Sequence, residues 1–259
     1  METIAVINQK GGTAKTSTAA ALAAGLTLKG YRVLMVDLDP QSNLSYIAGA
    51  DLRGRTIADL LQQAADPEAK QTVTTRGAIQ RTQQGHILAG NPGLAAADTV
   101  LAETAGKEYL LKGILEPVQG EYDYCIVDTP PTLGTLTINA LTAAQKAIAP
   151  AQADIFSLLA FSQLQTTIET VKRYCNPSLE LAGVVLTRYN GRAILSREIA
   201  DKLAEAAEQY GTKLYKAKIR ECISVKEAET MHQNIFSYAP RSNAAKDYTA
   251  LINEFLEER

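Results

Sequence analysis

The chain has 259 residues, of which 46% are apolar, so it can bury a sizeable core; no long linker divides it, and we expect one domain over residues 1–259. The formal charge of −2 excludes a uniformly basic nucleic-acid-binding coat. With no apolar run of about 18 residues and no signal peptide, the sequence indicates a cytoplasmic protein that has no membrane partner.

Short β-branched segments alternate along the chain with longer helical patterns, which is typical of βαβ units around a parallel sheet. We therefore predict an α/β fold, with a mostly parallel twisted β-sheet flanked by helices on both faces. The predicted strands are residues 3–7, 32–36, 124–128, 146–150 and 181–186. The predicted helices are residues 15–30, 56–65, 107–116, 135–145, 157–174, 196–210 and 246–258. The stretch 66–106 is the least regular, and "GHILAGNPG" within it predicts a strand and a turn before another helix.

The first strand leads into "VINQKGGTAKTS", residues 6–17, which reads as a glycine turn followed by the start of a helix. Such a turn directs backbone N–H groups and the positive end of the helix at one spot, which suits phosphate oxygens. Lys15 would reach the β- and γ-phosphates of a nucleotide, and Thr16 would ligate the Mg²⁺ that bridges them. The alternative is an ordinary glycine-rich turn. The standard P-loop pattern, G-x-x-x-x-G-K-[ST], is not met, because Gln9 and Ala14 stand in place of its two glycines.

Two further stretches place carboxylates at the ends of predicted strands. "VLMVDLDPQS" carries Asp37 and Asp39, and "YDYCIVDTPP" carries Asp128. The carboxyl ends of parallel strands meet at one edge of the sheet, so these side chains should face the glycine turn, where carboxylates can orient water or stand beside Mg²⁺. The alternative for Asp37 and Asp39 is that a carboxylate caps the following helix.

"KGGTAKTS" resembles the deviant Walker A box, K-G-G-x-G-K-[ST]-[ST], at every position except Ala14, whose Cβ would strain the loop. The order of this motif, "DLDPQ" and "CIVDTPP" resembles that of the ParA/Soj partition ATPases. The resemblance continues through "APAQADIFSLL" and "VVLTRYNGRA" to "AAKDYTALINEFL", so it covers nearly all of the chain. It implies a P-loop NTPase domain of the deviant Walker A type, which binds ATP and Mg²⁺ and hydrolyses ATP slowly without a partner.

The resemblance also implies a role for each matching position. Lys10 is the signature lysine, which reaches the nucleotide of the partner subunit in an ATP-bound homodimer. Asp39 would position or activate the attacking water, and Asp37 would support the Mg²⁺ shell. Nucleotide contacts fall on Lys10, Gly11, Gly12, Thr13, Ala14, Lys15, Thr16 and Ser17. Mg²⁺ ligation, in part through water, falls on Thr16, Asp37, Asp39 and Asp128, and catalysis falls on Lys10, Lys15, Asp39 and Asp128.

Positive charge is concentrated near the C-terminus. Residues 187–246 carry 11 Lys or Arg against 7 Asp or Glu, a net +4, whereas the rest of the chain carries 15 against 21, a net −6. ParA-type dimers bind DNA nonspecifically when they are loaded with ATP, and Arg192 aligns with a basic position associated with DNA contact in that family. A second such position falls on Ser224, which would shift or weaken the patch. The expected companions of Arg192 lie in or beside the C-terminal loops: Lys216, Lys218, Arg220, Lys226 and Arg241.

We therefore expect a nucleoid-associated ATPase that positions a DNA or protein cargo and is stimulated by a ParB-like or other adaptor. We expect no N-terminal helix-turn-helix extension of the kind found in longer relatives. One alternative is a MinD-like spatial regulator; the acidic end "NEFLEER" argues against it, because MinD-like proteins end in an amphipathic membrane helix. The other alternative is a nucleotide-dependent binding module that scarcely hydrolyses ATP because of Ala14.

Overall fold

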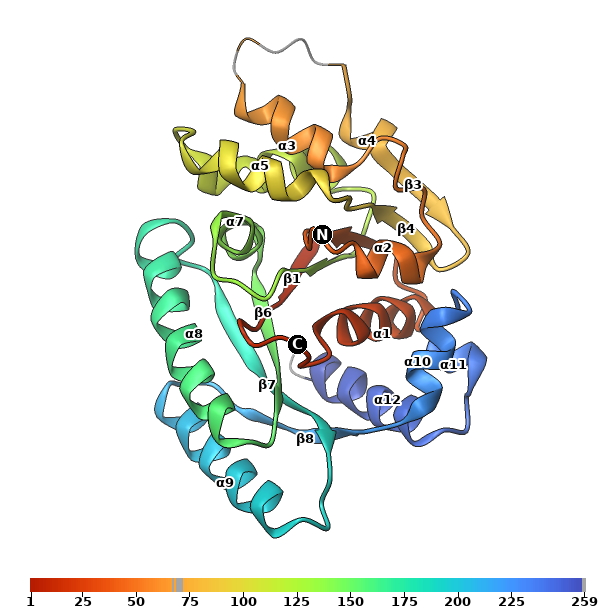
Figure 1. The fold of residues 1–259 in the computed structure, drawn as a ribbon, viewed down its shortest axis with the longest axis vertical. Coiled ribbons are helices and arrows are strands. Elements are labelled where there is room, and N and C mark those ends of the chain that lie inside the picture. Colours follow the sequence, from red (N-terminus) through yellow and green to blue (C-terminus); the bar gives the residue numbers. More distant parts are fainter. Residues whose placement is uncertain (67, 69–71, 258–259) are drawn as a thin grey trace.

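The computed structural model describes residues 1–66, 68 and 72–257. Within these residues the centre is an eight-stranded sheet in the order β3-β4-β2-β5-β1-β6-β7-β8 (Figure 1). Every neighbouring pair is parallel except β3 and β4, which form an antiparallel hairpin at one edge. The strands are β1 (Glu2–Val6), β2 (Val33–Asp37), β3 (Ile79–Thr82), β4 (Gly85–Leu88), β5 (Tyr124–Asp128), β6 (Lys146–Gln152), β7 (Glu180–Tyr189) and β8 (Leu214–Arg220). The predicted mostly parallel sheet is confirmed.

Helices cover both faces of the sheet and build a separate apolar core on each face (Figure 1). One face carries α1 (Lys15–Leu28), α2 (Asn43–Ala48), α10 (Ile223–Thr230), α11 (Ile235–Tyr238) and α12 (Asn243–Leu256). The other carries α3 (Ile57–Ala65), α5 (Gly93–Ala102), α6 (Leu110–Leu115), α7 (Thr135–Ala143), α8 (Ile155–Tyr174) and α9 (Ile194–Gln209). The short helix α4 (Thr75–Ala78) and the 3-10 turns η1 (Lys107–Tyr109) and η2 (Glu116–Val118) lie among the connections.

The central strands are apolar at nearly every position because they face both cores. Ile4 and Val6 pack in the core beneath α1, whereas their neighbours Ala5 and Ile7 pack in the core on the opposite face. This continuous apolar pattern is expected for parallel strands covered on both sides.

The first helix is fixed by a close contact with the last one. Gly25 of α1 lies against α12, and a Cβ at this position would stand only 2.1 Å from Cδ1 of Ile252. Ile252 is buried together with Tyr248, Leu251 and Phe255, as their helical spacing predicts. This packing holds the carboxyl-terminal half of α1 against α12.

The predicted strands correspond to β1, β2, β5, β6 and β7, and the predicted long helices to α1, α3, α7, α8, α9 and α12. Residues 107–116 hold α6 with its flanking 3-10 turns, and residues 85–93 hold β4 and the start of α5. The predicted end of the last helix, residue 258, lies outside the described residues. The edge strands β3 and β8 and the short helices α2, α4, α10 and α11 were not predicted.

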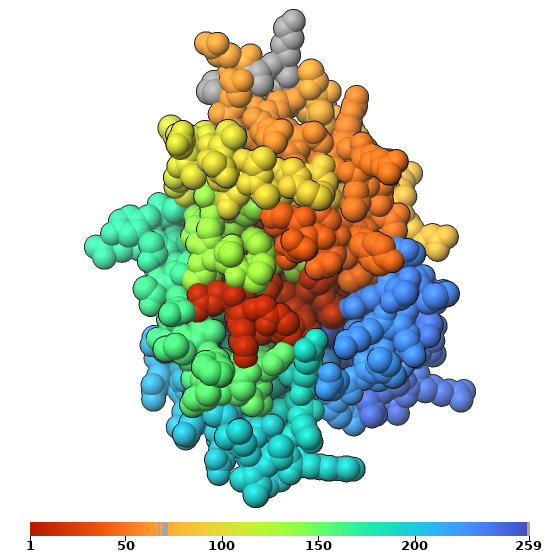
Figure 2. All heavy atoms as spheres, in the orientation of Figure 1, coloured from red at the N-terminus to blue at the C-terminus, as the bar shows by residue number. Residues whose placement is uncertain are grey.

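The strand order brings the carboxyl ends of β1, β2 and β5 side by side, since β5 pairs with both β1 and β2. Open parallel sheets bind ligands at this edge, where neighbouring strands connect to helices in different directions. Figure 2 shows the N-terminal segment, in red, at the centre of one face, bordered by the blue C-terminal helices. Across the described part of the chain, no helix is long and apolar enough to cross a membrane.

Candidate nucleotide-binding site

The glycine turn between β1 and α1 has the backbone of an anion-binding loop. Gly12 (φ 76°) and Ala14 (φ 61°, ψ 34°) both adopt the left-handed conformation. Helix α1 begins directly after Ala14, and its first turn has no acidic residue and, within the described chain, no side-chain cap. Its first N–H groups are therefore available to an anion, which the positive end of the helix also attracts. Ala14 strains the loop, because residues with a Cβ rarely adopt this conformation.

Neighbouring strands hold the loop in this shape. Gln152 of β6 donates through Nε2 to the carbonyl of Gly12 (2.8 Å), and Thr187 of β7 donates through Oγ1 to the carbonyl of Thr13 (3.0 Å). The side chain of Asn8 accepts from the Lys10 N–H (2.9 Å) and donates to the carbonyl of Pro150 (2.7 Å). The loop carbonyls thus bond to the strands, while the N–H groups at the start of α1 face the pocket.

Two buried carboxylates lie side by side below the loop. Asp37 on β2 and Asp128 on β5 are direct neighbours in the strand register, and both are fully buried. Asp37 accepts hydrogen bonds from the N–H (2.8 Å) and Oγ (2.7 Å) of Ser45, yet burial raises its pKa to about 6. Among the residues that the structure describes, neither oxygen of Asp128 makes a hydrogen bond of good geometry, although the Thr16 hydroxyl lies close enough to act against the rise of its pKa. Burial and the neighbouring Asp37 hold its pKa well above its usual value.

These carboxylates fit a divalent cation. A buried carboxylate without a partner is costly, and a cation beside it removes that cost. Within the described residues, no group of three or more His, Cys, Asp or Glu side chains could hold a metal ion. Mg²⁺ does not need such a group, because it usually combines one or two carboxylates with phosphate oxygens and water. Asp128, Asp37 and the Thr16 hydroxyl, which lines the pocket, are oxygen ligands of the kind that Mg²⁺ prefers.

Lys15 and Asp39 lie at the boundary between the carboxylates and the pocket. Lys15 is only 7% exposed; burial lowers its pKa, while the charges of Asp128 and Asp39 act in the opposite direction. Asp39 is also buried, lines the pocket, and accepts from the N–H of Gln41 at 2.9 Å. Asp37 also bonds the Ser45 N–H in the first turn of α2, whose N-cap residue is Ser42.

Lys10 points away from the pocket. Its ammonium group forms an ion pair with Asp154, which caps the amino end of α8, and lies 5.9 Å from the ring centre of Phe156. Next to this pair, α8 exposes Ile155 (58%), Phe156 (68%) and Leu159 (64%). Lys10 is therefore on the surface beside an apolar patch rather than in its own subunit's pocket.

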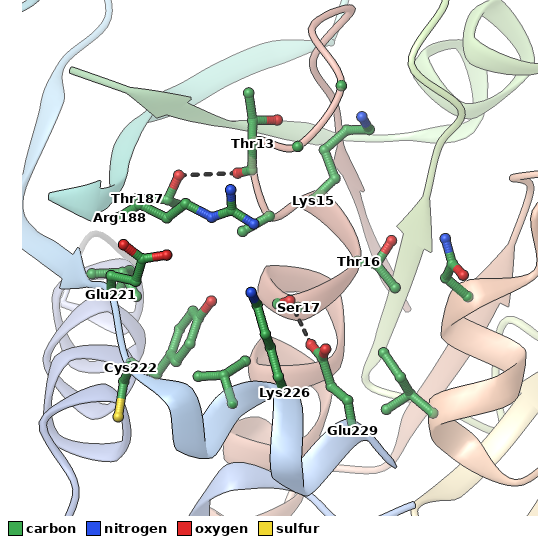
Figure 3. A pocket seen from close by; sticks show the side chains of 18 of the residues that line it. Thr13, Lys15, Thr16, Ser17, Thr187, Arg188, Glu221, Cys222, Lys226 and Glu229 are labelled. Carbon is green, nitrogen blue, oxygen red and sulfur yellow. Dashed lines mark hydrogen bonds between the residues drawn. The ribbon is translucent and has the colours of Figure 1, made fainter. Parts of the chain in front are cut away.

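The pocket itself has a volume of about 540 Å³, within the usual range for small-molecule sites. Figure 3 shows its walls, with Thr13, Lys15 and Thr16 on one side and Lys226 and Glu229 of α10 on another. All residues from Gly11 to Ser17 line it, together with Asp39. Lining residues that sequence reasoning missed include Thr187, Arg188, Ile219, Glu221, Cys222 and Glu229. "TRYN" at the carboxyl end of β7 could have indicated the first two, but β8 and α10 were not predicted.

The predicted DNA-binding residues do not form one group on C-terminal loops. Lys216, Lys218 and Arg220 lie at alternate positions of the edge strand β8, and Tyr215, Ala217 and Ile219 occupy the positions between them on the other face. Arg220 forms a bidentate ion pair with Asp247 (2.6 and 2.9 Å) and, like Lys226, lines the pocket. Lys218 lies 4.6 Å from the ring centre of Tyr189. Arg192 and Arg241 are exposed in turns.

The chain is similar to known proteins over nearly its whole length. The AAA-domain family matches residues 1–181. Sporulation initiation inhibitor protein Soj of Bacillus subtilis is 36% identical over 254 residues, which are 97% of this chain and 96% of Soj. Chromosome partitioning protein ParA of Caulobacter vibrioides is 34% identical over 261 residues, and the match covers 99% of this chain and 94% of that ParA.

A solved structure with a bound nucleotide is also similar to this chain. It is described as cobyrinic acid a,c-diamide synthase from Mycobacterium smegmatis with bound ADP and magnesium; it has a TM-score of 0.83 and 34% identity, and the match covers 100% of this chain and 95% of that chain. The predicted relationship to partition ATPases is confirmed by the named relatives. The chain belongs to the ParA/Soj family of P-loop ATPases with an AAA domain.

Proposed function

We propose that the protein is a Mg²⁺-dependent ATPase that acts as a nucleotide-controlled positioning switch, built from a single P-loop domain. The observation that carries this proposal is the open amino end of α1 beside two buried carboxylates, one of which makes no hydrogen bond of good geometry among the described residues. A triphosphate and a divalent cation together complement both features.

Within this site each side chain has a distinct task. The N–H groups of the glycine turn and the Lys15 ammonium hold the β- and γ-phosphates. Mg²⁺, held by Thr16, Asp37 and Asp128, would neutralise phosphate charge. Asp39 accepts a hydrogen bond from the attacking water and takes a proton from it as the water oxygen bonds to the γ-phosphorus. At the same time, the bond between the γ-phosphorus and the oxygen that bridges the β- and γ-phosphates breaks, and ADP leaves with that oxygen.

ATP would join two copies of the chain, and Lys10 would reach the partner's phosphates. Support comes from the place of Lys10 outside its own pocket, beside the exposed apolar side chains at the start of α8. A second copy would cover these side chains and exchange the Lys10–Asp154 contact for a contact with phosphate. A cation brought to the phosphates in this way stabilises the charge that develops during transfer.

We propose that the dimer binds DNA and that a ParB-like or other adaptor protein on the cargo stimulates hydrolysis. Support comes from the net +4 of residues 187–246 and from the exposed Arg192 and Lys216. Such binding needs only cations that face phosphates, so it would be nonspecific and sensitive to salt. The protein would therefore associate with the nucleoid.

The test is DNA retention by the purified protein with ATP, with ADP or without nucleotide, always with Mg²⁺ and at one salt concentration. We expect retention only with ATP. Arg192→Glu should weaken retention and lower the slope of log affinity against log salt by about one. Arg173→Glu, which changes an exposed arginine on α8, is the matched control and should bind as the unchanged chain does. Equal retention in all three nucleotide states, or none, would remove DNA as the track.

Two assays separate the remaining alternatives. Vesicle pelleting with ATP should leave the protein in the supernatant, whereas a MinD-like regulator would sediment with anionic lipid. Phosphate release above the level of the Asp39→Ala variant would exclude a module that binds ATP without hydrolysing it.

A further inference from the structure

The pocket continues beyond the phosphate-binding turn. Past Ser17 its walls come from β8 and α10, which contribute the apolar side chains of Ile219 and Val225. Helix α10 also contributes the charged side chains of Lys226 and Glu229 (Figure 3). A nucleotide whose phosphates lie on the glycine turn must place its ribose and base in this part of the pocket. The ribose comes first, because it is joined directly to the α-phosphate.

Glu229 faces the start of α1 from the opposite wall. Its Oε1 accepts a hydrogen bond from Oγ of Ser17 at 2.5 Å, and Figure 3 shows the carboxylate directed at this hydroxyl. Burial raises the pKa of Glu229, although the Ser17 hydrogen bond and the charges of Lys226 and Arg188 oppose this shift. Within the described chain, Oε2 has no hydrogen-bond partner. The wall thus presents a spare acceptor oxygen at the boundary between the phosphate and nucleoside ends.

The chemistry of a carboxylate restricts what it can face. An ionised carboxylate repels phosphate oxygens and accepts hydrogen bonds from O–H and N–H groups. The groups of ATP nearest to the α-phosphate that can donate are the ribose hydroxyls, and an acidic side chain binds ribose hydroxyls in the same way in dinucleotide-binding folds. The neighbouring Ile219 and Val225 are suited to the flat apolar face of a base instead.

We propose that Glu229 is a specificity-determining residue, which accepts a hydrogen bond from a ribose hydroxyl and so selects ribonucleoside over deoxyribonucleoside triphosphates. This inference rests on the proposed binding of ATP in the pocket. A site that bonds a hydroxyl discriminates against the analogue that lacks it, because the acceptor on the pocket wall then loses that hydrogen bond.

A purely structural role for Glu229 predicts a different result. If the carboxylate only ties α10 to α1 through Ser17, removal of either partner should weaken all nucleotides alike. If it only repels phosphate, its removal should tighten the binding of every nucleotide. Under the proposal, the effect depends on the sugar.

The experiment is calorimetric titration of the full chain, with Mg²⁺, using ATP, 2′-deoxy-ATP and 3′-deoxy-ATP. The unchanged chain should bind ATP about 10- to 100-fold more tightly than one of the two deoxy analogues, as expected for a hydrogen bond to a charged group. Glu229→Met, which keeps the volume and removes the acceptor, should bring this ratio close to one by weakening ATP alone. Glu229→Gln, which keeps a neutral acceptor, should give an intermediate ratio.

Two control variants complete the experiment. Glu227→Met changes an exposed glutamate on the same helix outside the pocket and should keep the preference of the unchanged chain. Ser17→Ala removes the tie between the helices and should also keep a preference for ribose. An equal affinity of the unchanged chain for ATP and both analogues, or an unaltered ratio in Glu229→Met, would overturn the role of Glu229 while ATP binding stands. A chain that binds none of the three nucleotides would overturn the proposed function as well.

Discussion

Replacing Ala14 by glycine should stabilise the nucleotide-free protein. Ala14 sits at φ 61° and ψ 34°, a left-handed conformation that costs a residue with a Cβ about 1–2 kcal/mol. Glycine removes this strain but gives the unfolded chain more conformational freedom, which returns about 0.5–1 kcal/mol. The net gain should be about 0.5–1 kcal/mol, which for a chain of this length raises Tm by about 1–3 °C.

The matched control is Gly12→Ala in the same loop. Gly12 has φ 76°, and a Cβ built there meets no atom within 4 Å, so the substitution adds strain without a clash. It should lower Tm by an amount similar to the rise in Ala14→Gly. Calorimetric scans of both variants in EDTA without nucleotide provide the measurement. A Tm for Ala14→Gly at or below that of the unchanged chain, alongside a lowered Tm for Gly12→Ala, would refute the claim that Ala14 is strained.

Phosphate release by Ala14→Gly should match that of the unchanged chain. A large rise would favour the alternative of a module that binds ATP and scarcely hydrolyses it because of Ala14.

Three further outcomes are expected. The pKa of Asp37 is raised to about 6, so the folded state retains a proton that the unfolded state loses near pH 4. The free energy of unfolding in EDTA should therefore fall as the pH rises from about 4 to about 6, by at most roughly 3 kcal/mol. Urea unfolding at both pH values should show a smaller fall for Asp37→Asn, and equal falls would contradict the raised pKa of Asp37. Asp39→Ala should bind ATP by calorimetry but release no phosphate, so release at the unchanged rate would exclude Asp39 as the group that accepts the proton. Asp154→Asn keeps the cap of α8 but frees Lys10 from its ion pair, which is worth about 0.5–1 kcal/mol. It should therefore lower the ATP concentration needed for dimerisation by about two- to fivefold. A higher concentration would show that Asp154 stabilises the dimer instead.

The phosphate end of the site could be predicted because its residues are close in sequence to the strands that position them. Gly12, Lys15 and Thr16 follow β1 directly, and Asp37 and Asp128 end β2 and β5. The carboxyl ends of parallel strands meet at one edge, so a prediction of the strands alone brings these side chains together.

The nucleoside end and the Lys10 contact could not be predicted, because they depend on packing between distant segments. Ser17 and Glu229 are 212 residues apart, and Lys10 and Asp154 are 144 apart. The edge strand β8, "LYKAKIR", has basic side chains at alternate positions, so its charge suggested a surface loop although its pattern has the period of a half-buried strand. Because β8 was not predicted, the pocket wall that contains Ile219, Arg220 and Glu221 could not be placed from the sequence.

The most direct test of the nucleotide switch is the molar mass in solution, measured by light scattering for the unchanged chain and for Lys10→Ala with ATP, with ADP and without nucleotide. We expect the mass of two subunits for the unchanged chain with ATP and Mg²⁺, and of one subunit with ADP or no nucleotide. Lys10→Ala should lose the ATP-dependent dimer or, if the dimer persists, its phosphate release. A mass of one subunit at ATP concentrations that saturate the site, or an unchanged dimer and unchanged turnover in Lys10→Ala, would contradict the account.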